Sequence, residues 1–246
     1  MRRKHRQFLW RPAAAAAALA LSLVGSAAAQ QEQGGGLIAQ AVREKLEAIK
    51  QSAAANKAAL QRYTWTESIQ VALNGEVKTT RQMTCRYGPD GKPQCQPIGP
   101  PPPQDQQRGL RGRIAEKKKE EFADYIQQVK GVIGLYVPPD SARMQAAHAA
   151  GNVSFSRPAS GEAGLVFRNY SLPGDSMTLD FAMATKKLAA LAVSTYLGDP
   201  ASPVTLNVQF AMLLDGTSYP AQEVVNAAAR GIQLTVTNSN YQKLAN

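Results

Sequence analysis

The sequence contains two cysteines and two histidines in 246 residues, so it is poor in the thiolate and imidazole groups that bind zinc. The cysteines, Cys85 and Cys95, are too far apart for the C-x-x-C motif of redox proteins. His148 lies in an alanine-rich segment without an acidic neighbour, which is typical of a surface residue. We therefore expect neither a metal site nor a cofactor.

The sequence also lacks the short motifs that carry catalysis. It contains no G-x-S-x-G, no H-E-x-x-H and no phosphate-binding loop, and the three glycines at residues 34–36 are not followed by Lys-Ser or Lys-Thr. Asp175 and Asp180 lie in a turn and on the polar side of a predicted strand, where solvated carboxylates are expected. We expect no catalytic residue and no enzymatic activity.

Beyond the N-terminal segment, no apolar run is long enough to span a bilayer. The first residues are basic, an apolar run extends from Ala13 to Gly25, and small residues follow up to Ala29. This order is typical of a secretory signal peptide, so we expect residues 1–29 to be removed and the protein to reach the periplasm. An ordinary secretory signal fits better than twin-arginine export, because the residues after the two leading arginines do not match that motif.

The charge of the whole chain overstates that of the exported protein. The signal segment carries five of the 28 lysines and arginines and no acidic residue, which leaves 23 basic against 18 acidic residues and a net charge of +5. An exported protein whose basic residues have no interleaved aromatic residues is not expected to bind nucleic acid. After a flexible lead-in at residues 30–36, the length suits one domain over residues 37–246.

The two cysteines flank a predicted turn, and an oxidising compartment favours a disulfide between them. A three-residue loop at 89–91, with Gly91 in the left-handed conformation, places Cys85 opposite Cys95. Non-hydrogen-bonded pairs of antiparallel strands have Cα atoms roughly 4.5 Å apart, within the range of a disulfide. The sequence therefore predicts a structural disulfide across a hairpin.

The first part of the domain predicts a helix followed by strands. Apolar residues at three- and four-residue steps predict the helix over residues 37–62. Alternating side chains then predict two strands within residues 63–87, joined at 73–75. We predict a three-residue loop there, because it places Trp65 opposite Met83 and Glu67 opposite Arg81. Apolar side chains then face each other, and opposite charges are paired.

A proline-rich segment interrupts the strands. Four consecutive prolines cannot enter a sheet, so residues 97–113 are predicted to form an exposed loop. A helix over residues 114–137 follows, and Asp140 is expected to cap a short helix over 141–150. Basic side chains gather where loop and helix meet, and they form either a solvated helix start or a surface for an anionic partner: Arg108, Arg111, Arg113, Lys117, Lys118 and Lys119.

From residue 152 onward the sequence predicts a series of strands, each with one apolar side. Met183 and Met212 belong to the apolar side of two of these predicted strands. Such an antiparallel sheet needs a cover, so we expect an α+β fold with helices on the concave face of a curved sheet. Strand alternation gives nine apolar residues on this face: Trp65, Ile69, Val71, Met83, Leu179, Phe181, Leu206, Val208 and Phe210. They form either a packed core or the lining of a cavity open to a ligand.

The order of these elements resembles the LolA/LolB-type lipoprotein carriers and their outer membrane lipoprotein-sorting relatives. The resemblance rests on the first helix, the strands in YTWTESIQVALNGEVKTTRQMTCRY, the helices inserted midway, and the closing strands in SMTLDFAMATKKLAALAVSTYLGDP, VTLNVQFAML and GIQLTVTNSNY. It implies an incomplete β-barrel of about 9–11 strands, plugged by helices, whose interior receives acyl chains. It also implies a periplasmic carrier whose partner is a lipid or the acyl chain of a lipoprotein.

A second hypothesis is a non-catalytic module of the cell envelope that binds a protein partner through the basic proline-rich loop. The two hypotheses place the ligand differently. The carrier binds a lipid on the apolar inner face of the sheet, whereas the envelope module binds a protein through the basic proline-rich loop at residues 97–113.

Overall fold

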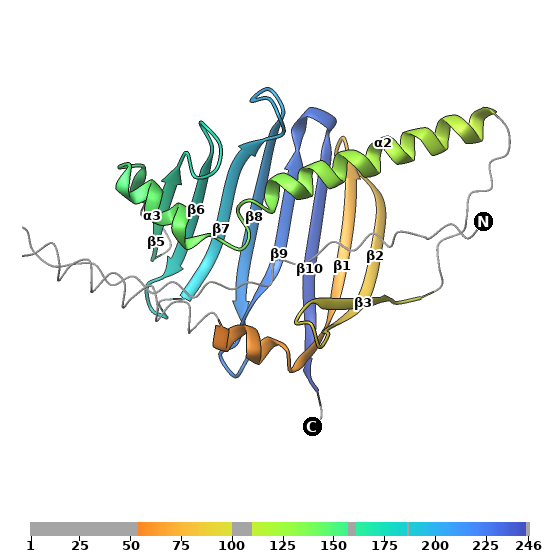
Figure 1. The fold of residues 1–246 in the computed structure, drawn as a ribbon. Coiled ribbons are helices and arrows are strands. Elements are labelled where there is room, and N and C mark those ends of the chain that lie inside the picture. Colours follow the sequence, from red (N-terminus) through yellow and green to blue (C-terminus); the bar gives the residue numbers. More distant parts are fainter. Residues whose placement is uncertain (1–53, 100–109, 157–160, 186, 245–246) are drawn as a thin grey trace, which may run out of the picture.

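The computed structural model describes residues 54–99, 110–156, 161–185 and 187–244 (Figure 1). Within these ranges, only the backbone of residues 110–115 is described. The predicted signal peptide at 1–29, the lead-in at 30–36 and residues 37–53 of the predicted first helix lie outside these ranges. Residues 54–60 are helical, as the sequence predicts for this part of the chain.

Ten strands and two longer helices follow residues 54–60. The strands are β1 (Tyr63–Leu73), β2 (Glu76–Tyr87), β3 (Pro93–Pro97), β4 (Val153–Ser156), β5 (Glu162–Arg168), β6 (Ser176–Ala182), β7 (Lys187–Tyr196), β8 (Pro203–Met212), β9 (Ser218–Ala227) and β10 (Ile232–Lys243). The helices are α2 (Leu110–Ile133) and α3 (Ser141–Ala149), and a single 3-10 turn occupies Ala228–Arg230.

All ten strands belong to one antiparallel sheet with the order β3-β2-β1-β10-β9-β8-β7-β6-β5-β4. Neighbours in this order are neighbours along the chain except at one place, where β1 pairs with β10. The last strand therefore joins the first three strands to the remaining six. The sheet is curved and not closed, with β3 and β4 at its edges (Figure 1). The predicted α+β fold, an incomplete barrel of nine to eleven strands, is confirmed.

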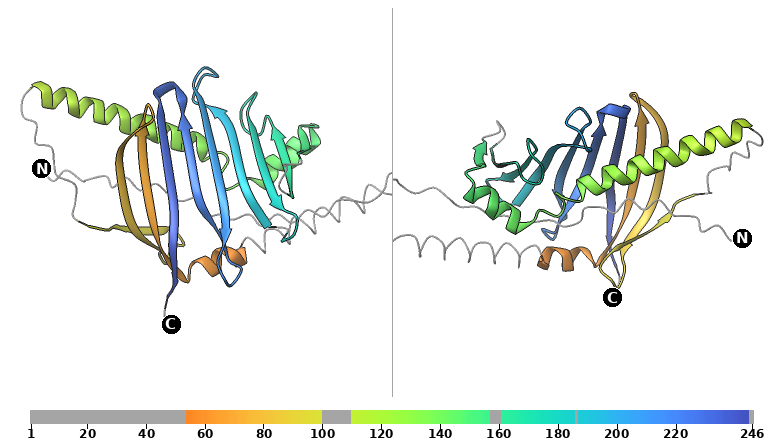
Figure 2. Two further views of the ribbon diagram at one scale, coloured as in Figure 1. Left: turned by 180° about the vertical axis from the view of Figure 1, so that it is seen from behind. Right: turned by 45° about the horizontal axis from the view of Figure 1, so that its top comes forward.

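The helices α2 and α3 cover one face of this sheet. Figure 2 shows the strands in front of α2 when the molecule is seen from behind, so this helix crosses the opposite face, and α3 lies against β5. That face is the inner face, because its side chains form one buried cluster with residues of α2. Residues 54–60 lie at one end of the sheet, where the side chain of Asn56 exchanges hydrogen bonds of 2.9 and 2.8 Å with the backbone of Ser218.

The predicted boundaries of the central helices need one correction. Helix α2 begins at Leu110, so residues 110–113 of the predicted loop are helical, and Pro97 belongs to β3. Leucine and arginine favour helix, and the last proline before this helix is seven residues away. The helix ends at Ile133, before Gly134, and α3 is capped as predicted, since Asp140 accepts bonds from the backbone of Ala142 and Arg143.

The predicted register of the first hairpin is wrong. The turn has two residues, Asn74 and Gly75, whose φ angles of 52° and 80° are those of a type I′ turn. A bulge beyond this turn then shifts the register. As a result Glu67 faces Met83, and Arg81 is not opposite Glu67. The predicted pairing of acid and base therefore does not form.

The second hairpin matches its prediction. Cys85 faces Cys95 and forms a disulfide with it, and their Cα atoms are 4.1 Å apart. The amide of Gly88 donates to the carbonyl of Lys92 at 2.8 Å, and Gly91 adopts a φ of 68°. A left-handed residue closing a three-residue loop is what the sequence Pro-Asp-Gly favours here. The disulfide therefore ties the short edge strand β3 to β2.

Replacing both cysteines in Cys85→Ala/Cys95→Ala should lower the free energy of unfolding by about 2–3 kcal/mol, because the unfolded chain regains the freedom of the closed loop. Denaturant unfolding followed by circular dichroism measures this difference. A reducing agent should destabilise the wild type by a similar amount and leave the double variant unchanged. Equal stability of both proteins under oxidising conditions would contradict a structural role for this bond.

Tyr136, just after α2, anchors that end of the helix to the sheet. Its side chain is fully buried, and its hydroxyl donates to Asp175 and lies 2.8 Å from the hydroxyl of Thr195 on β7. Asp175 also accepts bonds from three backbone amides, at residues 170, 171 and 172. The sequence predicts a solvated Asp175, which is wrong, because the carboxylate is 2% exposed and is enclosed by its own turn.

Substituting Tyr136→Phe should lower the free energy of unfolding by about 1–3 kcal/mol, because Asp175 and Thr195 lose a partner in a buried environment. The matched control is Tyr196→Phe, whose hydroxyl bonds the carbonyl of Pro173 at an exposed site. That control should change stability by less than about 0.5 kcal/mol. Thermal or denaturant unfolding of both variants compares the two sites, and equal losses would refute the anchor.

Candidate functional site

The nine predicted lining residues come together on the inner face of the sheet. Seven of them are buried and two, Val71 and Phe210, are partly buried against the same cluster. They come from β1, β2, β6 and β8, so the topology joins residues 65–83 to residues 179–210. Their placement on one face follows from strand alternation, and their role in lining a ligand stays a prediction.

Two methionines that continue this alternation in the sequence are exposed and do not belong to the buried cluster. Met183 is 57% exposed and Met212 is 49% exposed. Met183 follows the last residue of β6, where strand alternation no longer applies. Met212 is the last residue of β8, at the end of the strand, and the register shift beside it places the extra residue, Ala221, in β9.

The predicted basic surface is described only in part. Arg108 lies outside the described residues, and Arg111 and Arg113 are helical residues whose side chains the structure does not describe. The lysines at 117–119 are exposed, and Lys117 lies 3.9 Å from the carboxylate of Glu121, one helical turn away. A surface pair of this kind contributes little stability. The three lysines are therefore available to solvent, and their role in binding stays a prediction.

Glu67 is a buried acid in the middle of this apolar face. It lies on β1 between Trp65 and Ile69, which point to the same side, and it is 0% exposed. Neither of its carboxylate oxygens has a hydrogen-bond partner among the residues that the structure describes. Burial disfavours the charged form, and it raises the pKa of Glu67 to about 7.

Asn238 faces Glu67 across the pairing of β1 with β10. Its side-chain amide donates to the carbonyl of Pro220 at 2.9 Å, while its Oδ1 atom is buried without a donor in the described part of the chain. The indole Nε1 of Trp65 is likewise buried without an acceptor there. The inner face therefore holds both acceptors and a donor that the described chain leaves unsatisfied.

A second acid, Glu223, lies close to this region. It is on β9, 2% exposed, and faces Val236 on β10, two residues before Asn238. Burial raises the pKa of the Tyr241 hydroxyl well above its usual value, and the charges of Glu223 and Glu67 raise it further. Burial and the charge of Glu223 raise the pKa of Tyr87 in the same way. Both tyrosines therefore lie within the electrostatic field of buried carboxyl groups.

A cluster of four aromatic rings lies near the two acids, whose charges raise the pKa of two of its tyrosines. Trp65 stacks on Tyr241 with an interplanar angle of 12° and a centroid distance of 5.7 Å. Tyr87 lies on Trp65 at 5.1 Å, and Tyr219 lies on Tyr241 at 4.3 Å. Ring faces carry partial negative charge, so the aromatic cluster and the carboxyl groups both contribute negative potential to this region.

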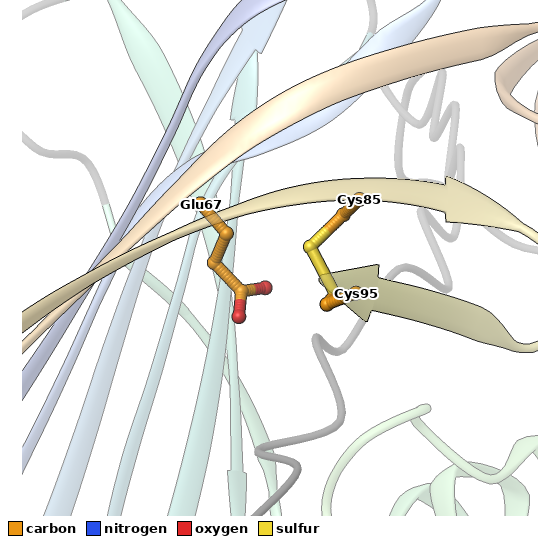
Figure 3. A group of neighbouring side chains, drawn as sticks. All are labelled: Glu67, Cys85 and Cys95. Carbon is orange, nitrogen blue, oxygen red and sulfur yellow. A yellow bond between two sulfur atoms is a disulfide. The ribbon is translucent and has the colours of Figure 1, made fainter. Parts of the chain in front are cut away.

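The disulfide forms one side of the Glu67 environment (Figure 3). A carboxylate oxygen of Glu67 and the sulfurs of Cys85 and Cys95 all lie within 4.8 Å of one another. Metal binding by cysteine requires a thiolate, and the sulfurs here are bonded to each other. The three residues are therefore not a three-ligand metal site in this state. The disulfide supplies no proton to the carboxylate and adds to its desolvation.

Sequence reasoning missed Glu67, Glu223 and Asn238 as site residues, although a signal for each was present. Glu67 shares its strand parity with Trp65 and Ile69, so it interrupts an apolar face. Glu223 and Asn238 have the same parity as buried neighbours on β9 and β10. A charged or amide residue at an inward position is the informative exception to alternation.

Within the described residues, no helix combines the length and the apolar character needed to cross a membrane. His148 is exposed, as the sequence predicts.

No family model matches the chain, and no curated protein matches it. Among solved structures, the chain is similar to a DUF1329 family protein from Desulfovibrio piger at 12% identity and a TM-score of 0.40, over 77% of this chain and 88% of the other. It is also similar to a LolA superfamily protein from Nitrosomonas europaea at 10% identity and a TM-score of 0.34, over 76% of this chain and 87% of the other. The LolA superfamily is the group that the order of elements in the sequence resembles.

Glu67→Gln should make stability less dependent on pH. The raised pKa means that the folded state holds the proton more tightly than the unfolded state, so stability is highest below pH 4.5 and falls as pH rises through about 7. At pH 8 the variant should be more stable than the wild type by about 1–3 kcal/mol, and at pH 4.5 the two should be nearly equal.

Denaturant unfolding at several pH values measures this difference. The control is Glu76→Gln, an exposed carboxylate that pairs with Lys78 at 2.6 Å and should have little effect at any pH. A wild type whose stability, relative to Glu67→Gln, does not fall between pH 5 and 8 would show that Glu67 is solvated.

Proposed function

We propose that this protein is an exported, periplasmic binding or carrier protein for a hydrophobic ligand with an acyl or alkyl chain. The ligand lies between the inner face of the curved sheet and helix α2. Export rests on the signal-like residues 1–29, and the apolar character of the ligand rests on the side chains that alternate onto the inner face. No catalytic step is part of this proposal.

The observation that carries the proposal is the small area over which α2 meets a broad apolar face. Within residues 116–133, the buried side chains are Ile126, Val129 and Ile133, all in the last third of the helix. Residues 116–124 are exposed, including Phe122 at 37%, and the N-terminal end of the helix projects past β2, beyond the strands (Figure 1). The inner-face side chains themselves are buried, so an alkyl chain reaches this apolar surface where the weakly attached part of the helix separates from it.

The anchor at Tyr136 fits this role for α2. The buried hydroxyl network fixes the C-terminal end of the helix to β7 and to the turn that holds Asp175. Toward the other end of the helix, the described side chains of residues 117–124 are exposed, so none of these is buried as Tyr136 is. A cover fixed at one end can separate from the sheet at the other, which gives an alkyl chain a route to the inner face.

The test is lipid retention and dye binding by the purified protein. Mass spectrometry of an organic extract should find bound lipid, and a hydrophobic fluorescent dye should bind with a stoichiometry near one and be displaced by fatty acid. Val208→Phe, which enlarges an inward side chain on β8, should weaken dye binding by about tenfold because it fills part of the ligand space. Asn207→Phe, the outward neighbour on the same strand, should leave binding unchanged.

The stability of both variants separates a ligand space from a packed core. If the inner face is a fully packed core, Val208→Phe should destabilise by about 1–3 kcal/mol through overpacking, and neither protein should bind dye while folded. That result, together with an extract free of lipid, would refute the carrier proposal.

A further inference from the structure

Three buried acceptor atoms on the inner face lack a hydrogen-bond donor within the described chain: the two carboxylate oxygens of Glu67 and Oδ1 of Asn238. The two side chains face each other across β1 and β10, where opposite Cβ atoms are about 4.5–5.5 Å apart. Buried polar groups nearly always have a partner from the protein, from water or from a ligand. These acceptors therefore indicate a group that supplies several donors at one point.

The charge of the region favours a cation as that group. Desolvation alone shifts the pKa of Glu67, and no lysine or arginine of the described residues offsets it. The second buried carboxyl, on Glu223, adds negative potential that the hydroxyls of Tyr87 and Tyr241 register. A cation bound here would offset the cost of burying Glu67.

The chemical type of the cation follows from the number and kind of buried atoms that lack a hydrogen-bond partner. A primary ammonium group has three N–H donors, which match the three acceptors of Glu67 and Asn238. A quaternary ammonium has no N–H to donate, and a calcium or magnesium ion requires about six oxygen ligands.

We propose that the inner face at β1, β10 and β9 binds the primary ammonium head group of an amphiphile, with Glu67 and Asn238 as its acceptors. This inference rests on the proposed carrier function and specifies the class of ligand. The alkyl chain extends from the head group over the apolar residues of the inner face, of which Ile69 is the next on β1. The indole N–H of Trp65 donates to an oxygen beside the amine where the ligand has one.

The experiment compares decylamine with decanol, which have the same chain length and differ in the head group. Each is titrated into the exported protein at pH 8, and binding is followed by calorimetry and by the fluorescence of Trp65, since Trp10 lies in the predicted signal peptide. The wild type should bind decylamine about tenfold or more tightly than decanol, as charge-assisted hydrogen bonds require. Glu67→Gln should reduce that preference to about twofold or less, because it removes the charge. Glu76→Gln, at an exposed site, should retain the full preference.

A pH series on the wild type tests the same inference without a variant. Decylamine stays protonated below about pH 10, so a fall in its affinity as pH drops through 7 reports protonation of Glu67. Tyr87 and Tyr241 remain neutral over this range because burial raises their pKa. Glu223 is the other carboxyl that faces this region, so the series is repeated in Glu67→Gln, which retains it. In Glu67→Gln the affinity for decylamine should not fall as the pH drops through 7.

The outcomes distinguish this inference from the carrier proposal. Equal affinity for decylamine and decanol in the wild type overturns the ammonium site and leaves the carrier proposal intact. A preference for decylamine that survives in Glu67→Gln also overturns it, because the amine is then bound elsewhere. If neither compound binds the folded protein, the carrier proposal fails and the ammonium site fails with it.

Discussion

The apolar inner face of the ten-stranded sheet must be kept from water, and the other features of the structure follow from this requirement. Each large apolar side chain that is fully buried there contributes roughly 1.5–3 kcal/mol. The sheet is open, with β3 and β4 at its edges, so strands alone do not enclose this face. Helices inserted between β3 and β4 supply the cover, and the pairing of β1 with β10 makes one continuous surface from two separate parts of the chain.

The cover is attached more firmly at one end than at the other. The hydroxyl of Tyr136 reaches Asp175 and Thr195 in a buried network, and three backbone amides complete the bonding of Asp175. At the other side of the molecule, the disulfide fixes the short strand β3 to β2. The two fixed points hold the sheet and the C-terminal end of α2, while residues 116–124 of α2 are exposed and contribute little burial.

The buried acids are the exception to the apolar inner face and therefore its most informative feature. Raising the pKa of a carboxyl from 4.5 to about 7 corresponds to about 3 kcal/mol at high pH, comparable to the gain from one large apolar side chain. A fold with an extensive apolar cluster can accommodate such a cost. In a carrier, this energetic cost can provide ligand specificity. A buried acid distinguishes ligands by their head groups, whereas apolar contacts alone discriminate only weakly between alkyl chains of similar length.

The sequence by itself determined the class of fold, the strands after residue 152, the helix cap at Asp140 and the disulfide hairpin, because each depends on neighbours close in the chain. It also placed all nine lining residues on one face, since alternation has a fixed period of two. Only the tertiary structure decided the register of β1 against β2, because a bulge near Lys78 changes which residues face each other without changing the pattern. It also decided that Glu67 meets Asn238 and lies near Glu223, because 156 or more residues separate them in the chain and only the pairing of β1 with β10 brings them together.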